Sequence, residues 1–148
     1  MSTEENVRNA SKQFYNALTG MAKGNAGQMG EIWLHDENVT AMHPIGGRDI
    51  GWTAVKNSFE QVAGLATEGE IELKDQLIRV VGDVAYEIGI ETGQVNVAGN
   101  QINIGQRVTN IYQLKDGKWK MIHHHGDTSQ AMLDVLNKLQ TATEKVGK

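Results

Sequence analysis

The sequence predicts an α+β fold in which helices pack in the concave face of a strongly curved antiparallel sheet. Hydrophobic residues recur at helical spacing before residue 64 and after residue 129, whereas the period changes to two between residues 70 and 126. Glycines interrupt the period-two segments at Gly89, Gly93 and Gly105. Glycines inside strands are typical of bulges and bends, so we expect the sheet to be strongly curved.

Composition limits the class of protein. The chain has 148 residues, enough for one domain with a core, and we expect a single domain over residues 1–148. Its net charge of −4 and its lack of a Lys/Arg cluster argue against a nucleic-acid partner. Cysteine is absent, which excludes disulfides and Cys-based zinc sites and fits a cytoplasmic location. No apolar run suits a signal peptide or a membrane span, so no membrane partner is expected.

Three helices and a short strand are expected before the sheet. Ser2 and Glu5 form a capping box for a first helix that ends near residues 20–24, and a shorter helix follows around residues 29–33. A strand over residues 39–43 is stopped by Pro44, and Asp49 is the expected N-cap of a third helix. The apolar residues that define the two longer helices are Val7, Ala10, Phe14, Leu18, Met21, Trp52, Val55, Phe59 and Val62.

Four antiparallel strands and a last helix follow. The strands are expected at about 70–81, 84–97, 101–114 and 118–126, joined by short turns. Thr128 or Ser129 is the expected cap of a C-terminal helical extension over about residues 129–145. Its apolar stripe consists of Met132, Val135, Leu136, Leu139 and Val146.

The last predicted hairpin carries polar groups that a plain sheet has no need of. Because side chains alternate along a strand, Trp119, Met121, His123 and His125 should share one face and His124 should point outward. An apolar face that ends in two imidazoles is typical of a pocket wall, so Trp119, Met121 and His123 are expected ligand-binding residues.

The register of this hairpin decides which groups meet. A three-residue loop at Lys115–Gly117, which we favour over a two-residue turn, places Arg107 opposite His125 and Thr109 opposite His123. Arginine beside two imidazoles favours their neutral forms and can bind a carboxylate or another oxyanion, with Thr109 as a further ligand contact. The alternative is a purely structural polar network, partnered by Asp127, Glu87 or Glu91.

Other candidates are less tied to one role. His43, before Pro44 at the end of a strand, suits a general base but is equally compatible with a backbone-bonded turn histidine. Tyr15 can point its hydroxyl into the pocket, and Trp33 and Trp52 can line it, although core packing is the commoner role of such residues. A metal site is a further alternative, in which His123 and His125 have metal-ligand spacing and His43 supplies a third ligand. Because only the His-x-His pair is clear and a metal site needs a recognisable set of ligands, we predict no metal, and we predict no cofactor.

The same hairpin resembles a known superfamily. Arg107-x-Thr109, the run Asp116-Gly-Lys-Trp119 and His123-x-His125 are similar to the ending of SnoaL-like proteins, which share the nuclear transport factor 2-like superfamily with ketosteroid isomerase-like proteins. The ending is also similar to the association domain of calmodulin-dependent kinase II. The resemblance covers about residues 5–129.

The resemblance implies a cone-shaped fold with an internal pocket, and a homodimer formed through the outer sheet face. His43 stands where ketosteroid isomerase-like members carry a catalytic Asp. We therefore expect a small-molecule pocket, in which His43 or His125 transfers a proton on a carbonyl-bearing or aromatic substrate and Arg107 holds an anionic oxygen. Such an enzyme would be a cofactor-independent isomerase, cyclase or dehydratase-like lyase. The alternative is a non-catalytic binding or oligomerisation module.

Overall fold

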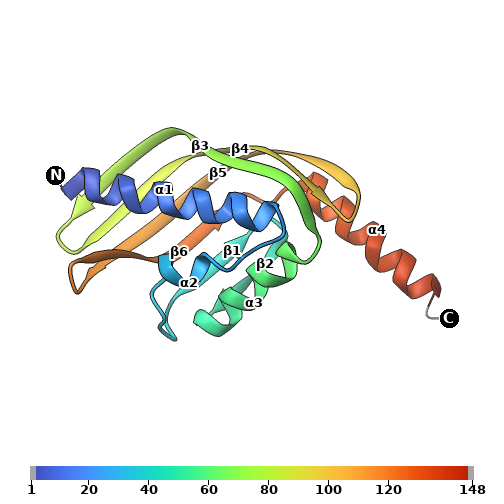
Figure 1. Ribbon diagram of the computed structural model, residues 1–148, viewed down its shortest axis with the longest axis horizontal. Helices are drawn as coiled ribbons and strands as arrows, with labels where there is room; N and C mark the ends of the chain where they lie inside the picture. The colour runs from blue at the N-terminus through green and yellow to red at the C-terminus, as the bar shows by residue number, and fades with distance from the viewer. Residues whose placement is uncertain (1–2, 147–148) are drawn as a thin grey trace.

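The computed structural model describes the backbone of residues 3–146 and the side chains of residues 3–141 (Figure 1). Ser2 of the expected capping box and the Val146 side chain therefore lie outside the described residues. The elements in chain order are α1 (Thr3–Ala22), α2 (Met29–Ile32), β1 (Thr40–His43), β2 (Gly46–Ile50), α3 (Trp52–Ala63), β3 (Ala66–Val81), β4 (Val84–Val97), β5 (Asn100–Lys115), β6 (Lys118–Gly126) and α4 (Gln130–Val146).

The six strands form one curved sheet in the order β2-β1-β6-β5-β4-β3. All neighbouring strands are antiparallel except β1 and β6, which run parallel. The long strands β3, β4 and β5 arch over α1, while α3 lies beside the short strands and α4 projects beyond the far end of the sheet (Figure 1). The predicted α+β class and the curved sheet are confirmed.

Glycine and strand bulges produce the curvature. Strand β3 is bulged twice against β4, and Asp75 at the second bulge has a left-handed φ of 54°. Gly93 has a φ of 144°, and a Cβ added there would lie 1.9 Å from the carbonyl oxygen of Glu70. Only glycine tolerates both this backbone conformation and this close approach. A Cβ at Gly105, directly across the ladder from Thr92, would meet nothing within 4 Å.

Three local predictions need correction or completion. Residues 46–50 form β2, because Pro44 and Ile45 turn the chain back so that Gly46 pairs with His43. Gly46 and Gly47, with φ values of 91° and 78°, lie at the irregular part of this ladder. Asp49 therefore lies in a strand, and Gly51 rather than Asp49 occupies the N-cap of α3. Strand β3 begins at Ala66, four residues earlier than expected. At α4, the Ser129 hydroxyl accepts the Met132 N–H at 3.3 Å, as expected of a cap.

The core lies between α1, α3 and the concave face of the sheet. Val7, Phe14 and Leu18 of α1 are at most 4% exposed, as are Val55 and Phe59 of α3. They pack against the alternate apolar residues of β4, β5 and β6, so the helical stripes expected from the sequence face the sheet. Within residues 3–146 no helix has the length and apolar character needed to cross a membrane.

Candidate functional site

The turn between β5 and β6 has two residues rather than the three that we favoured. Lys115 pairs with Lys118 and Leu114 with Trp119, so Asp116 and Gly117 alone form the turn. Their φ values are 52° and 77°, the left-handed pair of a type I′ turn, which the Asp-Gly dipeptide favours because its twist matches that of the strands. The expected pairing of Leu114 with Lys118 is wrong for this reason.

A bulge in β6 then reverses the faces of the histidines. Tyr112 pairs with Met121, but the preceding residue of β5, Ile111, pairs with His123, so one residue of β6 is extra. As a result Met121 faces the interior, His123 and His125 face outward, and His124 points into the core with 2% exposure. The expectation that Met121, His123 and His125 share a face, with His124 on the surface, is wrong.

Arg107 lies on the outer face as well. Its Nε donates to Oδ2 of Asp127 at 2.8 Å, and its side chain is 84% exposed. The hydrogen bond and the opposite charge hold the pKa of Asp127 below its ordinary value and raise that of Arg107. Arg107, Thr109 and His125 do come together, but around an open depression of about 640 Å³ on the outer face. They do not line the interior of the cone.

His123 contacts the neighbouring strand instead of an internal ligand. Its Nδ1 lies 2.7 Å from the Thr40 hydroxyl, and its ring packs edge-on against His125 at a centroid distance of 5.8 Å. Partial burial, and then the neighbouring His125, lower its pKa. Within the described residues no three His, Cys, Asp or Glu side chains are grouped to hold a metal ion. His43 lies inside the cone, so the alternative metal set is split between two faces of the sheet.

The aromatic residues expected to line a pocket pack in the core. Trp33 is 1% exposed, with its ring 6.4 Å from Trp52 and 6.0 Å from Phe59, and Trp52 stacks on the His35 ring at 4.6 Å. Met121 is fully buried, and Trp119 packs partly buried against the same core. None of Trp33, Trp52, Trp119 and Met121 borders the cavities described next, whereas Phe59 borders one of them.

Two adjoining cavities of about 60 Å³ each lie inside the cone, between α1, α3, the sheet and the first turns of α4. One is almost purely apolar and is bordered by Met132 and Leu136 of α4. The other shares Met132 with it and ends in a polar cluster. That cluster, which we call the inner polar site, consists of His43, Ser58, Glu91, Gln106 and His124.

His43 is held by a carboxylate at one side of the inner polar site. It is the last residue of β1, and the β1–β2 hairpin brings Asp49 back beside it, with Nε2 2.9 Å from Oδ2. The Ser58 hydroxyl of α3 donates to the same oxygen. Because a carboxylate can only accept, Nε2 of His43 carries the proton and Nδ1 keeps its lone pair. Burial lowers the pKa of His43, with Asp49 partly opposing the shift, so the ring is a neutral base at neutral pH.

Glu91 of β4 supplies a buried carboxyl group to the same cavity. The Tyr15 hydroxyl donates to Oε2 at 2.8 Å and the Gln106 Nε2 donates to Oε1 at 3.0 Å. Glu91 is 3% exposed, and burial raises its pKa. Burial also raises the pKa of Tyr15, with the two nearby glutamates adding to the shift. The Tyr15 hydroxyl thus reaches the carboxyl group that borders the cavity, while its ring packs edge-on against Phe14 at 5.1 Å.

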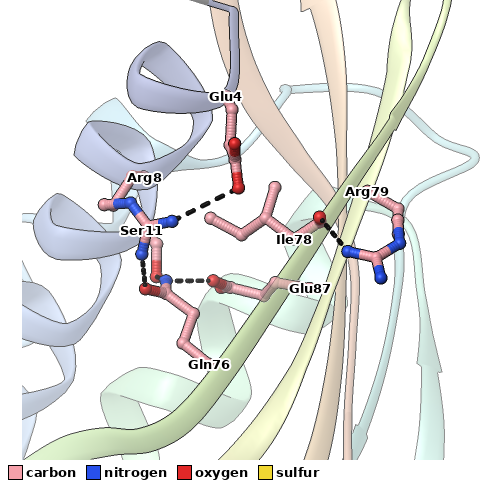
Figure 2. A network of polar contacts seen from close by, with 7 residues as sticks. All are labelled: Glu4, Arg8, Ser11, Gln76, Ile78, Arg79 and Glu87. Carbon is pink, nitrogen blue, oxygen red and sulfur yellow. Dashed lines mark hydrogen bonds and ion pairs between the residues drawn. The ribbon is translucent and has the colours of Figure 1, made fainter.

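A second buried glutamate, Glu87, anchors a network behind the cavity. Its oxygens accept hydrogen bonds from Asn110 Nδ2 at 2.9 Å, Tyr112 Oη at 2.6 Å and Gln76 Nε2 at 2.9 Å. Figure 2 shows how Gln76 continues the network toward the surface, where its Oε1 accepts from Arg8 of α1 at 2.6 Å. Glu87 is fully buried, and three donors satisfy its two oxygens.

His124 joins this network to the inner polar site. Its Nδ1 lies 2.6 Å from Asn110 Oδ1, and its ring centroid lies 6.2 Å from that of His43. Burial, and then the other three nearby histidines, lower the pKa of His124 to about 3. The sequence analysis named Glu91 only as a partner in a structural network, took Asp49 for a helix cap and placed His124 on the surface. It did not select Ser58, Gln106 or Asn110. Glu91, Gln106 and Asn110 share a visible signal, because each is a polar residue at an alternating buried position of a strand.

These features define a nuclear transport factor 2-like fold with an internal cavity that ends in polar side chains. The chain belongs to the SnoaL-like domain family, whose model matches residues 7–130. The match begins within α1, spans α2, α3 and the whole sheet, and ends at the first residue of α4.

Solved structures share the fold at low sequence identity. A candidate dehydratase of the NTF2-like family from Streptomyces avermitilis is 22% identical, with a TM-score of 0.75 over 86% of this chain and 96% of that one. A candidate calcium/calmodulin-dependent protein kinase type II association domain from Thiobacillus denitrificans is also 22% identical, with a TM-score of 0.68 over 83% and 94%. A candidate ketosteroid isomerase from Shewanella frigidimarina is 23% identical, with a TM-score of 0.64 over 80% and 92%.

A curated relative matches part of the chain. The F-box protein SKIP8 of Arabidopsis thaliana is 25% identical over 97 residues, which are 66% of this chain. The chain matches only 39% of the length of that protein.

Proposed function

We propose that the protein binds a small, mostly apolar molecule in the cavity inside the cone and transfers a proton on it, as a cofactor-independent isomerase, cyclase or dehydratase. The observation that carries this proposal is that His43, held by Asp49 at 2.9 Å, borders a cavity that Glu91 also borders. Similar folds named as a dehydratase and a ketosteroid isomerase agree with this class of chemistry.

The roles follow from the protonation states that burial favours. Nδ1 of His43 is the general base, because its pKa is lowered and its other nitrogen is committed to Asp49. Asp49 is a positioning residue that fixes the tautomer. Glu91 is the general acid, because its raised pKa favours the protonated form that can donate to a carbonyl oxygen. Arg107 and His125 have no part in this proposal, since both face outward.

The proposal is tested by proton exchange on a panel of small enolisable ketones in D₂O, followed by NMR. The wild-type protein should accelerate exchange of the α-protons of at least one member. His43→Gln should lower kcat/KM by about 10²- to 10⁴-fold, because the base is lost. Exchange no faster than in buffer across the whole panel would overturn the catalytic role and favour a binding module.

Asp49→Asn and Arg107→Gln are the matched variants. Loss of the Asp49 charge removes the influence that raises the pKa of His43, so the acid limb of the kcat/KM profile should move to lower pH. Arg107→Gln removes a charge from the outer face and should leave the exchange rate unchanged. A fall in rate for Arg107→Gln equal to that for His43→Gln would mean that the outer depression is the reacting site.

We further propose a homodimer formed through the outer face of the sheet. Exposed apolar side chains gather on the outer side of β3 and β4, including Leu77, Tyr86, Ile88 and Ile90, each 36–40% exposed. A second copy would remove this surface from water. A native mass of twice 16.2 kDa supports the dimer, and Ile88→Glu should return it to the monomer.

An oligomerisation hub is the second candidate function, favoured by the similarity to kinase association domains. A native mass larger than that of a dimer, as expected for a closed ring of subunits, would support the hub against the dimer. The single domain over residues 1–148, with residues 129–145 as an extension, and the cytoplasmic location remain predictions.

A further inference from the structure

His124 is a buried histidine whose protonated nitrogen can be assigned from its neighbours. The ring borders the cavity, and only 2% of the residue is exposed. Its Nδ1 lies 2.6 Å from the side-chain oxygen of Asn110. An Asn amide fits a site in either of two orientations, so the other partners of Asn110 decide which of its atoms faces His124.

The surrounding groups fix the Asn110 amide. Its Nδ2 lies 2.9 Å from a Glu87 oxygen and 3.1 Å from the Tyr15 hydroxyl. Glu87 already accepts hydrogen bonds from Gln76 and Tyr112, so it is a hydrogen-bond acceptor toward Asn110 as well. A turned amide would set two oxygens against each other at 2.9 Å in a buried site, which is strongly unfavourable.

The orientation of Asn110 therefore determines the tautomer of His124. The Asn110 oxygen can only accept, so Nδ1 of His124 donates and carries the single proton of the neutral ring. Nε2 then has a lone pair and no proton. Burial lowers the pKa of His124 to about 3, so the ring is neutral and offers a hydrogen-bond acceptor throughout the physiological pH range.

Glu91 is the donor of this cavity in the function proposed above, but several other donors nearby are already engaged. His43 commits its N–H to Asp49, the Ser58 hydroxyl also donates to Asp49, and the Gln106 Nε2 donates to Glu91. Two imidazole lone pairs, Nδ1 of His43 and Nε2 of His124, thus belong to rings 6.2 Å apart on one cavity wall. A ligand that complements this wall carries a hydrogen-bond donor.

We propose that His124 is a specificity-determining residue whose Nε2 accepts a hydrogen bond from a hydroxyl or N–H group of an apolar ligand. The inference rests on the proposed function only for the place where the ligand binds. It predicts that the site selects hydroxyl-bearing molecules against their methyl ethers, because a methyl ether leaves the buried lone pair unpaired.

The test has one arm that needs no ligand. Two-dimensional ¹H–¹⁵N NMR of the wild-type imidazoles at neutral pH should show His124 as the neutral Nδ1–H tautomer, with no titration between pH 8 and pH 5. An Nε2–H tautomer, or a charged ring at neutral pH, would overturn the inference. This arm also decides the question should a variant of His124 fail to fold.

The second arm measures binding of phenol and of anisole by calorimetry. Phenol should bind the wild-type protein at least tenfold more tightly, and His124→Phe should abolish that preference. His125→Phe, which alters the next residue on the outer face, is the matched control and should retain it. Equal affinity for both molecules would overturn the role of His124 while leaving the cavity site standing, whereas binding of neither would overturn both proposals.

Discussion

Two adjacent histidines of β6, His124 and His125, lie in opposite environments because they face opposite sides of the sheet. On the inner face of β6, His124 is 2% exposed, is held by Asn110 and has its pKa lowered to about 3. On the outer face, His125 is exposed beside the ion pair of Arg107 and Asp127. The chemistry of a side chain in this fold thus depends on which side of the sheet it faces, and one bulge decides the side for every residue at the end of β6.

The largest loss of stability is expected at Gly93, on the inner face of β4. Gly93→Ala would bring a Cβ to 1.9 Å from the Glu70 carbonyl at a φ of 144°, so the substitution should lower the free energy of unfolding by about 3 kcal/mol or more. Gly105→Ala, on the outer face of the adjacent strand, should change it by less than about 0.5 kcal/mol. Urea denaturation of both variants measures the contrast, and equal losses would show that the bend does not need glycine.

A smaller effect is expected in the pH dependence of stability. The pKa of His124 is about 3 when folded and near 6.5 when unfolded, so only the unfolded chain takes up this proton between those values. His124 should therefore lower the free energy of unfolding by about 1.4 kcal/mol per unit as pH falls from about 6 to about 4.

The comparison of His124→Phe with His125→Phe isolates this contribution. Urea denaturation between pH 7 and pH 4 should show a shallower acid-side loss for His124→Phe, whereas His125→Phe should follow the wild-type slope. Glu91 acts in the opposite sense, since its raised pKa makes the folded state bind more protons above the ordinary carboxyl range. Parallel curves for all three proteins would show that His124 is not neutral inside the fold.

The smallest effect is expected for the outer ion pair. Arg107→Ala removes the contact with Asp127, but the Arg107 side chain is 84% exposed and its charge is screened by water and salt. The melting temperature should match that of the wild type in high salt, with at most a slight loss in low salt. A large loss in high salt, measured by calorimetry, would mean that the interface of the proposed dimer extends over the ion pair and shields it from water.

The fold was predictable because its signals are repeated along many residues. The helical stripes and the alternation of the long strands each draw on five or more positions, so tertiary contacts did not override them. The three-residue loop that we favoured for the last hairpin was wrong, although the Asp116-Gly117 dipeptide itself favours the two-residue type I′ turn that the structure has.

The site was less predictable because a single residue controls it. Nothing in the local sequence marks the bulge beside Ile122, yet that one extra residue sends His124 inward and His123 and His125 outward. Glu91 and Asn110 left a visible signal, as polar residues at the buried positions of alternating strands, but hydrophobicity alone does not say that they bond to each other.

Helix α4 has a consequence for any molecule that enters the cone. Met132 and Leu136 border the internal cavities, which at about 60 Å³ each hold only a few waters. A ring-sized guest must therefore push these side chains aside. The apparent dissociation constant then equals the intrinsic one divided by the fraction of molecules with α4 displaced. Substitutions along this helix would thus tune affinity from a distance, without altering a single group that touches the guest.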